Sequence, residues 1–169
     1  MTTIERLRDQ SRERLVQRVT AGTYGTVLIL AALPLIEVVD VGSGVGWELV
    51  TGVGFATYIA HAYAEVMGDH VRSRSLLDRQ EFARALRDGR PILYAAVGPA
   101  LALGLGRVNV LSEAAALWCA LAVAILQLVG LGLFVGWAVT PRRSHWWVYG
   151  VAAAAMGGVV VAIKLSLSH

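Results

Sequence analysis

The sequence of 169 residues lacks the short motifs that mark common enzymes and pumps. It contains no G-x-x-x-x-G-K-[ST] phosphate loop and no G-x-S-x-G nucleophile turn. Its single cysteine, Cys119, cannot form an intramolecular disulfide, a zinc ribbon or a haem-attachment pair. These absences argue against an ATP-driven pump and a serine hydrolase. They favour a protein that is not an enzyme, and they indicate no particular cofactor.

Charge is also scarce, because only 16% of the residues are charged and lysine occurs once, as Lys164. By contrast, 56% of the residues are hydrophobic, where a soluble domain has about 45–50%. The 14 arginines give a net charge of +3, but they lie beside apolar runs. Arginines in that position are signals of membrane topology, so no nucleic-acid partner is expected.

The apolar residues form five runs that predict an all-α integral membrane protein, a single domain built as a bundle of about five transmembrane helices. Pro34 should bend the first span, because proline removes one helical hydrogen bond. The third span is the shortest, contains Pro99, and is compatible with a re-entrant segment. The predicted spans are 22–39, 47–67, 91–106, 111–139 and 146–165.

Two polar segments complete the predicted architecture. Residues 2–19 have a helical period and predict an N-terminal amphipathic helix on the inner membrane surface, or else a solvated helical extension. Residues 68–90 predict a short cytoplasmic helix between spans two and three.

The arginines indicate how the chain is oriented in the cell membrane, either a plasma or an inner membrane. Five arginines precede the first span, six lie in 68–90 and two in 140–144. Only five crossings place all three segments on one side, which the positive-inside rule makes cytoplasmic. We therefore expect a multi-pass protein with a cytoplasmic N-terminus and its C-terminus outside.

The second span carries the residues most suggestive of chemistry, Tyr58, His61, Glu65 and Asp69. Spacings of three, four and four place them on one face of a helix, which we call the polar stripe. Ionisable residues inside a span are costly and commonly line a cavity or an ion path, and histidine titrates near neutral pH.

Three interpretations of this polar stripe stay open. It would form the inner half of a proton or ion pathway, or its His61, Glu65 and Asp69 would bind a metal. Alternatively, its members only make structural contacts, with Glu65 paired to an arginine such as Arg18 and His61 bonded to a neighbouring helix.

A second polar pair consists of Glu37 and Lys164, which lie at similar depth near the outer ends of spans one and five. They are candidates for an intramembrane ion pair, with Glu113 as a competing partner, because an unpaired charge at that depth is expensive. A role in selectivity or gating is the alternative.

Small residues four apart, Gly132 with Gly136 and Ala154 with Gly158, allow two helices to approach closely. This spacing suits packing within one bundle or between subunits. A chain of this size has few helices with which to enclose a pore, so we expect a homo-oligomer.

The leading functional hypothesis is therefore a small oligomeric ion or proton channel or transporter. The alternative is a non-enzymatic scaffold or regulatory subunit that binds a cytoplasmic protein or anionic lipid through its basic segments. A metal-dependent membrane enzyme is the second alternative.

Overall fold

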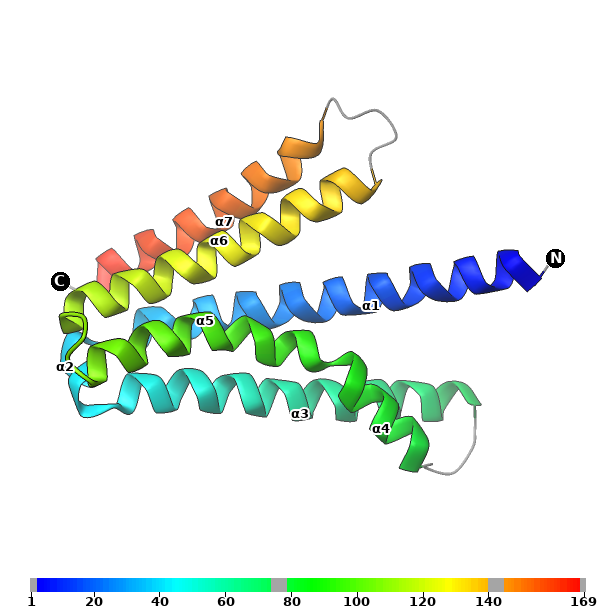
Figure 1. Ribbon diagram of the computed structural model, residues 1–169, viewed down its shortest axis with the longest axis horizontal. Helices are drawn as coiled ribbons and strands as arrows, with labels where there is room; N and C mark the ends of the chain where they lie inside the picture. The colour runs from blue at the N-terminus through cyan, green and yellow to red at the C-terminus, as the bar shows by residue number, and fades with distance from the viewer. Residues whose placement is uncertain (1–2, 74–78, 140–144, 168–169) are drawn as a thin grey trace.

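The computed structural model describes residues 3–73, 79–139 and 145–167, and within these ranges the chain forms helices and no strand (Figure 1). The predicted 140–144 connection, with Arg142 and Arg143, lies outside the described residues. The elements are α1 (Thr3–Ala32), the 3-10 turn η1 (Leu33–Leu35), α2 (Val38–Ser43), α3 (Val45–Ser73), α4 (Arg79–Asp88), α5 (Arg90–Arg107), α6 (Glu113–Val139) and α7 (Trp146–Leu167).

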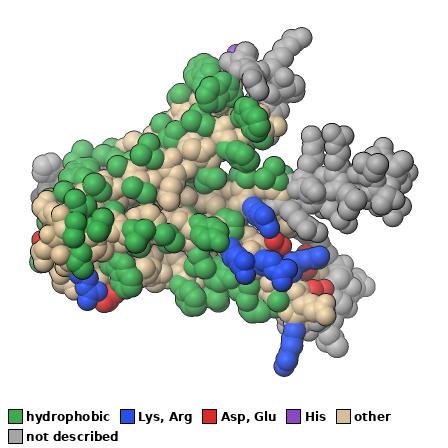
Figure 2. Space-filling view, in the orientation of Figure 1, with side chains coloured by type: hydrophobic (Ala, Val, Ile, Leu, Met, Phe, Trp, Pro, Cys, Tyr) green, Lys and Arg blue, Asp and Glu red, His purple; other side chains and the backbone are tan. Residues whose placement is uncertain are grey.

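Three helical segments are long and apolar enough to cross a bilayer, and they indicate a membrane location. They are Leu15–Leu35, Glu113–Ala138 and Trp146–Ser166. Hydrophobic side chains are also spread across the face in Figure 2, whereas charged side chains gather toward its two ends. The predicted all-helical fold is confirmed for the described residues, and the three apolar helices are consistent with a membrane protein.

Helix α5 is the centre of the bundle, since it packs against α1, α3 and α6. Its buried positions are mainly small, as at Ala96, Ala100 and Gly106, and this lets the neighbouring helices approach closely. Its 18 residues span about 27 Å at 1.5 Å per residue. That length nearly matches the hydrocarbon core of a bilayer, which is about 30 Å thick.

The first predicted span, 22–39, does not form one bent helix. Helix α1 ends at Ala32, Pro34 lies at the start of η1, and the chain is extended at Ile36 before α2 begins. Proline breaks the helix here because it cannot donate the next backbone hydrogen bond.

The predicted N-terminal helix is likewise not a separate surface element. It continues directly into the first span as the single helix α1. No proline occurs before Pro34, so every residue that joins the two segments, Val19 to Gly22, has the backbone N–H that a continuous helix needs.

The helix ends gather at the two ends of the bundle (Figure 1). The start of α1, helix α4, the end of α6 and the start of α7 lie toward one end, which we call the basic end. Helix α2, the α5–α6 connection and the end of α7 lie at the opposite end, which we call the α2 end.

Glycines bring α6 and α7 together along the hairpin that these two helices form. A Cβ atom on Gly132 would lie 2.6 Å from the carbonyl oxygen of Tyr149, and one on Gly136 would collide with that of Trp146. The Gly132 and Gly136 pair therefore packs within the chain. Gly158, by contrast, has open space where its Cβ would be.

Candidate functional site

The polar stripe lies on the half of α3 that is nearer the basic end (Figure 1). Tyr58 reaches α4, where its hydroxyl donates a 2.8 Å hydrogen bond to the carbonyl oxygen of Leu86. Further along α3, Ala62 and Val66 pack against Ala85 of α4. Tyr58 and its neighbours therefore hold α4 against α3.

His61 lies on the side of α3 that faces α1. Its ring is tilted by 33° against that of Tyr24, with the two centroids 6.4 Å apart. His61 is half-buried and Tyr24 is half-exposed, so the contact lies at the edge of the bundle rather than in its core. This placement gives the imidazole a neighbour on another helix and leaves it partly accessible.

Glu65 is half-buried one turn closer to the basic end. His61 and Asp69 on its own helix act on it electrostatically, and so do Arg84 and Asp88 of α4. The stripe is thus part of a larger group of charges, although the sequence pattern pointed only to its α3 members.

Arg18 of α1 completes this group. One of its guanidinium nitrogens lies 4.0 Å from a carboxylate oxygen of Asp88. Arg18, which the sequence offered as a partner for Glu65, therefore pairs with an acid on α4 instead. We call the residues contributed by three helices the polar cluster: Arg18 of α1, His61 and Glu65 of α3, and Arg84 and Asp88 of α4.

The sequence analysis did not identify Arg84 and Asp88 as site residues, because nothing in the sequence shows which residues they face. Their spacing of four places them on one side of α4, a regularity that also occurs on ordinary solvated helices. Only the docking of α4 through Ala85 and Leu86 brings that side toward Glu65.

The described residues contain no group of three or more His, Cys, Asp or Glu side chains close enough to hold a metal ion. His61 and Asp69 are eight residues apart, which separates them by about 12 Å along a helix axis. This arrangement gives the metal-enzyme hypothesis no support.

Lys164 binds the backbone at the break between α1 and α2. Its ammonium group donates hydrogen bonds to the carbonyl oxygens of Pro34, at 2.9 Å, and of Ile36. These carbonyls are available because the helix has ended at Ala32. Glu37 and Asp40 attract the ammonium group electrostatically, but no Glu37–Lys164 contact of 4.0 Å or less occurs in the described structure.

Glu37 has its own local role at the start of α2. Its backbone N–H donates a 2.9 Å hydrogen bond to the Asp40 carboxylate, and the two residues form a capping box. Glu113 of α6 lies beside α2 at Gly42. The second polar pair is therefore part of the packing at the α2 end, where Lys164 joins α7 to the end of α1.

Comparison with known proteins found no matching family model, no matching curated protein and no matching solved structure.

Proposed function

We propose that the chain crosses the membrane five times, with the basic end in the cytoplasm. Two observations support this topology. The start of α1, helix α4 and the ends of α6 and α7 that flank residues 140–144 lie toward one end of the bundle (Figure 1). Helix α5 runs through the centre of the bundle, as a true crossing would, rather than along its edge.

Cysteine labelling from the two sides of the membrane tests this topology. In a Cys119→Ala background, Gln80→Cys on α4 should react with a membrane-impermeant maleimide only from the cytoplasmic side. Ser43→Cys at the end of α2 should react only from outside. Labelling of both positions from the same side would contradict five crossings.

We propose further that the protein moves protons or small ions, with the polar cluster as the inner entrance of the pathway. The observation that carries this proposal is the meeting of Arg18, His61, Glu65 and Asp88 from three helices at the basic end. Ionisable groups at membrane depth are expensive and usually serve ion or proton paths. Of the two α3 residues in the cluster, His61 lies farther from the basic end than Glu65.

The pathway proposed here requires more than one copy of the chain. Beyond His61, the contact between α1, α3 and α5 contains Ile29, Val50 and Ala96, all of which are buried. Apolar packing of this kind closes a route through the middle of one bundle. In the proposal, the outer half of the path therefore runs between copies, in a homo-oligomer.

Flux measurements in liposomes test transport. Wild-type protein should carry protons or a common cation, and Glu65→Gln should lower that flux at least tenfold. The matched control is Glu81→Gln, which removes a carboxylate from α4 outside the polar cluster. Absence of flux in wild-type protein at acidic and neutral pH, under both polarities of membrane potential, would refute the proposal.

A docking role is the second candidate, and the surface of α4 favours it. Arg79, Arg84 and Arg87 are exposed on this helix, together with Phe82. Such a surface suits an acidic protein partner at the cytoplasmic face. Capture of a defined partner that is lost on Arg79→Glu and Arg87→Glu, with flux absent, would establish this role.

A further inference from the structure

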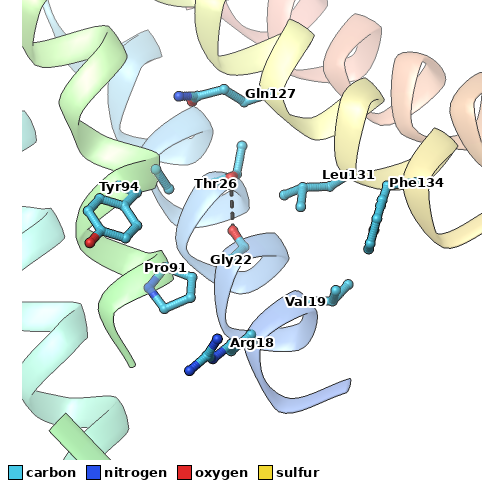
Figure 3. Close-up of a pocket in the computed structure, with 10 residues that line it drawn as sticks. Arg18, Val19, Gly22, Thr26, Pro91, Tyr94, Gln127, Leu131 and Phe134 are labelled. Atoms are coloured by element: carbon cyan, nitrogen blue, oxygen red, sulfur yellow. Dashed lines mark hydrogen bonds between the residues drawn. The ribbon is translucent and has the colours of Figure 1, made fainter. Parts of the chain in front are cut away.

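A cleft of about 430 Å³ opens between α1, α5 and α6 (Figure 3). It shares Arg18 with the polar cluster, but no residue of α3 lines it. Small-molecule sites commonly enclose about 300–1,000 Å³. Gly22 forms part of the wall on α1, and the Pro91 ring faces it from α5. Leu131 and Phe134 line the α6 side (Figure 3).

The polar groups of the cleft are separated along its length. Arg18 lies toward the basic end and Thr26 lies eight residues further along α1, about 12 Å deeper at 1.5 Å per residue. Between them the lining is apolar, with Val19 and Leu131 as examples. The cleft is therefore amphipathic, with the positively charged Arg18 side chain at one end and an apolar lining over most of its length.

The guanidinium of Arg18 has capacity for a second anion. Its side chain is 57% exposed, and its one ion pair in the described structure is the 4.0 Å contact with Asp88. A guanidinium carries five N–H donors, which a single distant carboxylate does not saturate. A phosphate group binds such a fork well.

The deep end of the cleft is defined by polar side chains. The Thr26 hydroxyl donates to the Gly22 carbonyl oxygen at 2.8 Å, so its proton is already used. The amide oxygen of Gln127 is buried without a hydrogen-bond partner in the described structure. Thr26 and Gln127 mark the deep end of the cleft, and its apolar part lies between them and Arg18 (Figure 3).

We propose that the cleft binds one anionic phospholipid of the inner leaflet. The phosphate lies against Arg18, and one acyl chain runs past Val19, Leu131 and Phe134 toward Thr26. At about 30 Å³ for a group of water size, the cleft holds on the order of a dozen methylene groups. The charge of the lipid complements the arginine, and its tail complements the lining. The choice of the inner leaflet rests on the proposed topology, whereas binding at Arg18 does not depend on transport.

Native mass spectrometry of the full chain in a neutral detergent tests the site. The probes are phosphatidylglycerol and phosphatidylcholine with the same acyl chains. The wild-type protein should retain one phosphatidylglycerol in preference to phosphatidylcholine. Arg18→Gln should lower this preference about fivefold, the effect of one basic residue at a membrane surface. Arg87→Gln removes an exposed arginine outside the cleft and should leave the preference unchanged.

A second variant, Val19→Trp, tests the acyl-chain position by filling the cleft. It should abolish the retained lipid adduct while the helical circular dichroism and the thermal transition stay as in the wild type. Equal loss of preference in Arg18→Gln and Arg87→Gln would show general surface attraction and overturn the assignment. So would equal retention of the two lipids by the wild-type protein, or an adduct that survives in a folded Val19→Trp protein.

Discussion

The contact between α6 and α7 depends on a glycine whose replacement has a calculable effect. In Gly132→Ala the new Cβ would lie 2.6 Å from the carbonyl oxygen of Tyr149, whereas ordinary contact begins at 3.4 Å. The helices would have to separate by about 0.8 Å, the difference between these two distances, because the obstructing atom belongs to the backbone.

Overpacking of this kind costs about 1–3 kcal/mol. Alanine in a helix recovers up to about 1 kcal/mol relative to glycine. We therefore expect Gly132→Ala to lower the free energy of unfolding by about 1 kcal/mol. For a chain of this size, that change corresponds to a decrease in Tm of about 2–4 °C.

The assay is thermal unfolding in detergent, followed by circular dichroism or tryptophan fluorescence. The matched control is Gly130→Ala on the same helix, where a Cβ would have no neighbour within 4 Å. This control should keep or slightly raise Tm. Equal transitions in Gly132→Ala and Gly130→Ala would refute the close packing of α6 against α7.

Two further predictions concern hydrogen bonds between helices. Lys164→Met should lower Tm by several degrees, because the carbonyl oxygens of Pro34 and Ile36 lose their donor and buried acceptors are costly to leave unpaired. Lys164→Arg should retain most of the stability, and a Tm of Lys164→Met equal to the wild type would count against this contact. Tyr58→Phe should weaken the docking of α4 by about 1 kcal/mol, the typical net value of one hydrogen bond. Backbone amides of α4 should then exchange hydrogen faster in Tyr58→Phe than in the wild type, with no change in the other helices. Unchanged exchange in α4 would show that the Tyr58–Leu86 hydrogen bond does not stabilise the docking.

The helical membrane architecture could be predicted because it depends on composition along the chain. Apolar runs of sufficient length need helices in a bilayer, whatever their neighbours are. The end of α1 was harder, since the sequence shows that Pro34 disturbs a helix but not by how much. Whether a proline bends or ends a helix depends on what satisfies the freed carbonyls, and here Lys164 from the far end of the chain does so.

The partners of the site residues could be predicted only in part. The periodicity of α3 placed His61 and Glu65 on one face, but the face alone does not determine what lies opposite. Asp88 reaches Arg18 and Glu65 only because α4 is fixed by Tyr58 and Ala85. The cleft at Arg18 depends on how α1, α5 and α6 diverge in space, which no short stretch of sequence encodes.

The unbroken course of α1 has a mechanical consequence. Its 30 residues measure about 45 Å, so roughly 15 Å of helix extends beyond a hydrocarbon core about 30 Å thick. Figure 1 shows this extension projecting past the other helices at the basic end. A helix without a joint transmits tilt as a rigid rod. A partner that pulls on the projecting end would thereby move Arg18 and, at the far end, the junction at Pro34 that Lys164 holds.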